Sequence, residues 1–78
     1  MKNFEECIKA CDEAIEKSQS GGGYDYVKLA KAMSRKGNAL VKLGRVDEGI
    51  QMFEKALLEN QDHGIKMALI AAQKIKKE

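Results

Sequence analysis

A stripe of basic and amide side chains is the part of the sequence best suited to binding chemistry. Lys31, Arg35 and Asn38 stand at positions i, i+4 and i+7, so in a helix they share one face. Lys28 lies one turn earlier on the same face. Ammonium and guanidinium groups hold carboxylates through charge-assisted hydrogen bonds, and arginine can form two in parallel. The spacing therefore predicts a surface for an anionic ligand, although such a stripe is also typical of a solvated helix face.

The two cysteines and the single histidine do not suggest a catalytic or metal site. Cys7 and Cys11 are four residues apart on the apolar face of an expected helix, where a disulfide would strain the backbone. We expect both to be reduced thiols, buried as small hydrophobic groups. His63 stands at an expected helix start, far from both cysteines, so we predict no catalysis, metal or cofactor. Gly21 to Gly23 lacks the lysine and the strand-to-helix context of a phosphate loop.

The segments expected to position these side chains include one pattern that occurs twice. The stretch from Phe4 to Ile15 is echoed by Val46 to Leu57 at a constant offset of 42 residues. The matched pairs are Phe4 and Val46, Cys7 and Gly49, Ile8 and Ile50, Cys11 and Phe53, Ala14 and Ala56, and Ile15 and Leu57. A period in this range indicates stacked helical hairpins, which usually present a concave binding surface rather than an enzyme pocket.

Apolar residues at helical spacing predict four helices. Their expected ranges are residues 3–17, 24–43, 47–59 and 63–77. Asp47 and Asp62 are the expected N-caps of the third and fourth helices, and Gly37 indicates that a neighbouring helix passes close to the second. The connections are short, so neighbouring helices should be antiparallel. The predicted fold class is therefore all-α, with antiparallel helical hairpins in a single domain over residues 1–78.

The expected fourth helix has apolar residues on two sides. One side carries Ile65, Ala68, Leu69, Ala72 and Ile75, and the other carries Met67, Ile70 and Ala71. This distribution predicts that the helix contacts more than one element.

The composition excludes several classes of function. Charged residues make up 33% and hydrophobic residues 44%, which argues against disorder. A net charge of +2 and a basic face almost without aromatic residues give no case for nucleic-acid binding. The longest apolar run, Met67 to Ala72, is far too short to span a membrane, and the amino terminus has no signal-peptide pattern. We therefore expect a cytoplasmic protein with no nucleic-acid or membrane partner.

The segment from Met33 to Ala56 resembles a tetratricopeptide repeat. The residues that carry the motif, in its order of bulky, small, apolar, small, aromatic and alanine, are Met33, Gly37, Leu40, Gly49, Phe53 and Ala56. Gln61 stands where the family often has proline, and Lys36 stands where it usually has leucine or isoleucine. The first helix matches the second half of an earlier repeat. The resemblance implies about one and a half repeats plus a closing helix.

A closer resemblance lies between Tyr26 and Leu40, in the pattern Ala-Lys-Ala-x-x-Arg-x-Gly-Asn. It is similar to the last repeat of the central tetratricopeptide domain in the Hop/Sti chaperone-organising co-chaperones. In that family the domain binds the acidic carboxyl-terminal peptide Glu-Glu-Val-Asp of heat shock protein 90 through a carboxylate clamp. The resemblance implies a stress-response co-chaperone adaptor that binds the tail of heat shock protein 90 or 70 class chaperones. Lys31 and Arg35 match clamp residues, with Asn38 and Lys28 beside them.

A second interpretation is self-association without peptide binding. The first helix lacks the antiparallel partner that it would have in a complete repeat, so its apolar stripe from Phe4 to Ile15 should seek cover. A homodimer, with or without a swap across the glycine segment, would supply that cover. Both interpretations can hold together. The clamp would also be partial, because the family's other clamp residues lie on earlier repeats. An enzyme is the third class, and no constellation of residues supports it.

Overall fold

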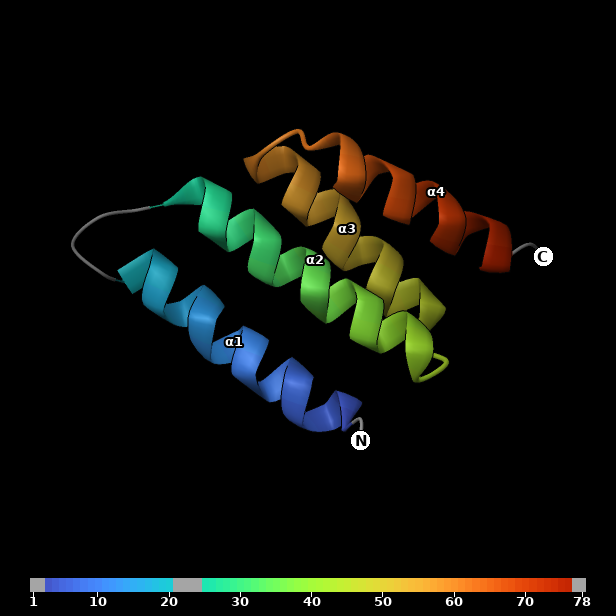
Figure 1. Cartoon of the computed structure of the whole chain (residues 1–78), viewed down its shortest axis with the longest axis horizontal. Coiled ribbons are helices and arrows are strands. Elements are labelled where there is room, and N and C mark those ends of the chain that lie inside the picture. Colours follow the sequence, from blue (N-terminus) through green and yellow to red (C-terminus); the bar gives the residue numbers. More distant parts are fainter. Residues whose placement is uncertain (1–2, 21–24, 77–78) are drawn as a thin grey trace.

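The computed structural model describes residues 3–20 and 25–76, and over these ranges the fold is all-α. Four helices are described: α1 (Phe4–Ser20), α2 (Tyr26–Lys42), α3 (Val46–Glu59) and α4 (His63–Lys76). They lie side by side in chain order, and consecutive helices run in opposite directions (Figure 1). This arrangement confirms the antiparallel helical hairpins. None of the described helices is both long and apolar enough to cross a membrane.

The ends of α2 follow from its flanking residues. The Asp25 carboxylate accepts hydrogen bonds from the backbone N–H groups of Val27 (3.1 Å) and Lys28 (3.2 Å), as an N-cap does. At the other end, Gly44 has φ 93°, and the Arg45 N–H donates to the Leu40 carbonyl at 2.8 Å. A glycine in this left-handed conformation is the usual way to end a helix. The helix therefore ends at Lys42, one residue before its expected end.

Other helix ends differ from the sequence-based expectations. α1 continues to Ser20, three residues past the expected end, and the expected start of the second helix at Tyr24 lies outside the described residues. The predicted N-cap role of Asp47 is wrong, because Arg45 occupies that position and makes no side-chain cap. Asp47 lies instead in the first turn, where the helix dipole favours an acidic residue. Asp62 does cap α4, since its carboxylate accepts from the Gly64 N–H at 2.7 Å.

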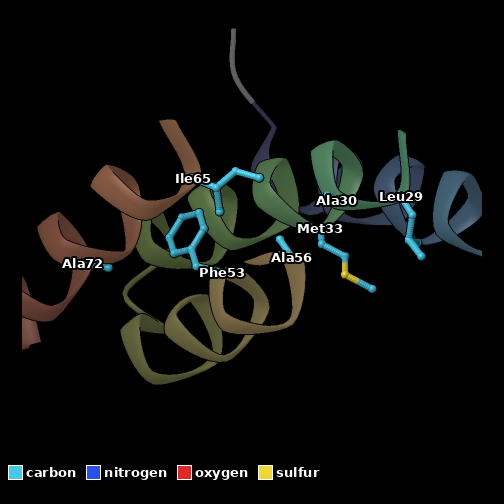
Figure 2. Packing of buried hydrophobic residues seen from close by; sticks show 7 residues of the cluster. All are labelled: Leu29, Ala30, Met33, Phe53, Ala56, Ile65 and Ala72. Carbon is cyan, nitrogen blue, oxygen red and sulfur yellow. The ribbon is translucent and has the colours of Figure 1, made fainter. Parts of the chain in front are cut away.

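The core lies where α2, α3 and α4 meet (Figure 2). Its buried members are Leu29, Ala30 and Met33 of α2, Phe53 and Ala56 of α3, and Ile65 and Ala72 of α4. Phe53 is 1% exposed, and its ring points toward Ile65 (Figure 2). The predicted close approach at Gly37 is confirmed. A Cβ there would lie 3.0 Å from the carbonyl oxygen of Gly49, and a Cβ at Gly49 would lie 2.7 Å from that of Gly37.

α4 packs mainly against α3 and also touches α2, which confirms the expectation of more than one neighbour. Ile65 and Ala72 are buried as expected, but Ile75 is 61% exposed. Ile75 borders a hollow between α4 and α2.

α1 packs against α2 alone among the described helices. Cys11 is buried, and Phe4, Ile8 and Ile15 are half-buried. The expectation that both cysteines are buried is wrong for Cys7, which is exposed. The cause is that α2 covers only one side of the α1 stripe. The other side, which includes Ala14, is left open.

Candidate functional site

The basic stripe predicted from the sequence lies on α2. This helix contains five basic residues and no acidic one. Its buried residues lie on the sides that face the core and α1, among them Leu29 and Met33 in the core and Ala32 beside α1. The remaining face therefore points outward, and the side chains of Lys28, Lys31, Arg35 and Asn38 are all exposed on it. Helical spacing thus places the four predicted residues together.

Three of these residues form one wall of a groove between α1 and α2. A hollow of about 350 Å³ lies there. Its α2 wall carries Lys28, Lys31 and Arg35, together with Ala32. Its α1 wall consists of four small residues, Cys7, Ala10, Cys11 and Ala14. One wall of the groove therefore carries positive charge, and the other wall is uncharged and made of small side chains.

Asn38 lies at the next turn, where a second hollow of about 210 Å³ continues the groove. Arg35 borders both hollows, so it links them. Asn38 and Lys42 also border a third hollow of about 310 Å³ between α2 and α4, which contains the exposed Ile75. The exposed face of α2 therefore forms a ridge with a groove on each side, and the polar stripe runs along its crest.

The cations on this wall are available to a ligand. Within the described ranges, Lys28, Lys31 and Arg35 form no ion pair with a neighbouring carboxylate. Lys36, in contrast, is engaged on the other side of α2, where its ammonium lies 2.5 Å from the Asp12 carboxylate of α1. This contact explains how a lysine is accommodated at a position where the repeat motif usually has leucine or isoleucine.

The thiol of Cys11 lies in the groove, and its pKa depends on the groups around it. Burial raises its pKa, and the neighbouring Cys7 thiol raises it further. The guanidinium of Arg35 acts in the opposite direction, so its charge reaches the groove floor. A buried thiol with a raised pKa is a poor nucleophile at neutral pH. Cys11 is consequently not suited to a covalent step, and the groove can hold a ligand by charge and shape.

The other described residues that could take part in catalysis or metal binding are not grouped into a site. His63 is exposed at the start of α4, in a hollow of about 410 Å³ beside Asp62 and Lys66. That hollow contains no serine or cysteine. Over residues 3–20 and 25–76, no group of three histidine, cysteine or acidic side chains is placed to hold a metal ion.

The comparison with known proteins identifies the same repeat that the sequence pattern indicates. Residues 30–63 match the family described as tetratricopeptide repeat. The chain carries a tetratricopeptide repeat. In this repeat, α2 and α3 form the hairpin, α1 precedes it and α4 closes it. The repeat brings its small residues, Gly37 and Gly49, face to face.

The whole chain is also similar to a segment of larger proteins. It is 39% identical over 82 aligned residues to Hsp70-Hsp90 organizing protein 3 of Arabidopsis thaliana and to Hsp70-Hsp90 organizing protein 1 of Glycine max. In both cases the match covers 100% of this chain and 14% of the relative. Stress-induced-phosphoprotein 1 of Caenorhabditis elegans is 39% identical over 61 residues, which is 78% of this chain and 19% of that protein. The chain thus spans about a seventh of the plant relatives that it matches.

Sequence reasoning identified the cationic wall but missed the opposite one. Ala10 was outside the expected apolar stripe, and Cys7 was expected to be buried. The available signal was the small size of these side chains. Small residues on one helix face leave a groove where no helix lies over them, and the sequence did indicate that the stripe from Phe4 to Ile15 needs cover.

Proposed function

We propose that this chain is a non-enzymatic interaction module that binds an acidic carboxyl-terminal peptide, of the Glu-Glu-Val-Asp type, from heat shock protein 90 or 70 class chaperones. The observation that carries the proposal is the exposed row of Lys28, Lys31 and Arg35 along one groove wall, which has no carboxylate partner among the described residues. The similarity of the chain to proteins named Hsp70-Hsp90 organizing proteins supports the choice of ligand. An adaptor of this kind would act in the cytoplasm.

The four residues have different parts in such a partial clamp. Arg35 can bind one carboxylate with two parallel N–H donors, because its guanidinium is planar. Lys31, one turn away, can hold the second carboxylate of a terminal aspartate, which carries both a side-chain and a main-chain carboxylate. Asn38 can donate an amide N–H from the adjoining hollow. Lys28 extends the cationic wall toward the upstream glutamates.

The exposure of these side chains sets the expected strength. Exposed charge pairs contribute about 0.2–1 kcal/mol each. Removal of Lys31 or Arg35 singly should therefore weaken binding by no more than about fivefold. The two effects should not simply add, because both side chains hold the same terminal aspartate. Binding should also weaken as salt is added, because exposed charges are screened.

The test is a titration of a fluorescent Met-Glu-Glu-Val-Asp peptide, followed by fluorescence anisotropy at two salt concentrations. The variant Lys31→Ala/Arg35→Ala should lose most of the binding. A matched control is Lys55→Ala/Lys66→Ala, which removes two exposed cations from α3 and α4 and should bind as the parent does. A peptide with an amidated carboxyl terminus should also bind more weakly. Equal binding by both double variants would refute the proposed site.

A second candidate function is self-association, with or without peptide binding. The specific observation in its favour is the exposure of Cys7 and Ala14 on a face of α1 that the sequence predicts to be apolar. A mass measurement by light scattering in the same buffer tests it alongside the peptide titration. A monomeric mass at high concentration would contradict it.

A further inference from the structure

The open face of α1 corresponds to a face of α3 that is covered within the same chain. By the offset of 42 residues, Cys7, Cys11 and Ala14 are equivalent to Gly49, Phe53 and Ala56. The three α3 residues are all buried, where α3 meets α2 and α4. Of the three equivalent residues on α1, Cys11 alone is buried. The chain's own repeat therefore shows that this kind of face takes a helix, and among the described helices α2 alone packs on α1.

The spacing of small residues on the open face fits a helical occupant. Asn3, Cys7, Ala10 and Ala14 recur at intervals of four, three and four residues. This is the period at which two helices pack along their length. The side chains are short, so a second helix can approach α1 closely.

The charges around the groove define the occupant further. Glu6 and Glu13 stand four residues before Ala10 and three residues after it, and Lys17 follows Glu13 one turn later, so the outer edge of the same face carries two acidic residues and one basic residue. All three are exposed. The opposite wall, on α2, carries Lys28, Lys31 and Arg35 without carboxylate partners among the described residues. An occupant with an acidic edge is required, and α1 itself has one.

We propose that the groove binds α1 of a second copy of this chain, in a twofold dimer whose two α1 helices run parallel. When the twofold axis is parallel to α1, the acidic edge of each α1 lies beside the basic wall of the other copy. α1 and α2 are antiparallel, and Cys7 and Arg35 border the same hollows. Glu6 of one copy is therefore level with Arg35 of the other, and Glu13 is level with Lys28 and Lys31.

The alternative, antiparallel pairing is electrostatically unfavourable. A twofold axis perpendicular to α1 would bring both basic walls to one side of the dimer and both acidic edges to the other. Like charges would then face each other, which opposes association. Charge thus selects the parallel arrangement.

The expected dimer is weak. α1 contains 17 residues, so the contact is one short helix long. Such an interface is smaller than the ~800 Å² per partner of a standard complex, and we expect dimers at protein concentrations on the order of 100 µM and above.

Disulfide formation between single-cysteine chains tests the helix direction. One chain carries Cys11→Ala and keeps Cys7, and the other carries Cys7→Ser, Cys11→Ala and Ala14→Cys. The two are mixed in equal amounts, oxidised with copper phenanthroline, and analysed by mass spectrometry. The parallel dimer places like positions opposite each other, so disulfides between identical chains should predominate. A majority of mixed disulfides, a random distribution, or no cross-linking at a concentration where the mass is dimeric would overturn the proposal.

Sedimentation equilibrium of charge-swapped variants tests the contacts. Glu6→Arg should raise the dimer dissociation constant about three- to tenfold, by removing an attraction and adding a repulsion. Adding Arg35→Glu to the same chain should restore the dissociation constant of the parent, since the two charges of the pair are then exchanged. Glu5→Arg makes the same charge change on an exposed residue that lies about 100° away from Glu6 around the α1 axis, and should have no effect. A monomeric mass throughout, or no restoration in the double variant, would refute the contact. Glu6 and Glu5 take no part in the proposed clamp, so the result of the peptide titration does not depend on whether these two variants change the dimer.

Discussion

Replacement of Gly49 by alanine should destabilise the chain, although alanine is the better helix former. At an ordinary helix position this change stabilises by about 1 kcal/mol. In the structure, however, a Cβ at Gly49 would lie 2.5 Å from Val41 Cγ2 and 2.7 Å from the Gly37 carbonyl oxygen. The valine side chain can rotate away. The oxygen belongs to the α2 backbone, so relief requires α2 and α3 to separate.

The size of the effect follows from that separation. The Cβ would lie about 0.7 Å closer to the Gly37 carbonyl oxygen than an ordinary contact distance of 3.4 Å. Overpacking costs about 1–3 kcal/mol, and a gap of this width also weakens dispersion contacts around the buried Phe53. We take the upper value because a backbone atom is involved. After the gain in helix propensity is subtracted, the net loss is about 2 kcal/mol.

Urea denaturation followed by circular dichroism measures this loss. With a slope of about 1 kcal/mol per molar urea for a chain of this size, the midpoint should fall by ~2 M. Gly64→Ala is the matched control. Its Cβ would lie 3.2 Å from the Asp62 carboxylate, a side-chain atom that can move, so its midpoint should stay constant or rise. If Gly49→Ala raised the midpoint as well, the close helix approach described here would be refuted.

Three further measurements test the packing. Phe53→Ala should reduce the free energy of unfolding by about 3–5 kcal/mol, because a fully buried ring is removed, and urea denaturation would show it. A double-mutant cycle with Lys36→Ala and Asp12→Ala should give a coupling below about 1 kcal/mol that decreases in high salt, since the ion pair is partly exposed. Iodoacetamide at pH 8 should modify Cys7 before Cys11, which is buried and has a raised pKa; equal rates by mass spectrometry would contradict this.

Local spacing was sufficient to predict the helices and the cationic stripe. The residues Lys31 and Arg35 share a face because helical geometry alone determines it, and Gly37 is informative because a missing side chain implies a close neighbour. Burial on α1 was not predictable in the same way. Whether Cys7 is covered depends on the number of helices that pack around α1, and apolar spacing is the same for one neighbour or two. Asp47 was misassigned for a related reason, since an acidic residue suits both the N-cap and the first turn.

The pattern of helix contacts has a consequence for local unfolding. Among the described helices α1 touches α2 alone, while α2, α3 and α4 supply the buried residues of the core around Phe53. Detachment of α1 would break the Lys36–Asp12 ion pair and remove Ile15 from the edge of the core, and would leave the buried core residues in place. Backbone amides of α1 should consequently exchange with solvent hydrogen through a partial opening, whereas those of α2 and α3 require global unfolding. The groove therefore exists only for the fraction of time that α1 is attached, and a ligand that spans both walls would slow exchange selectively in α1.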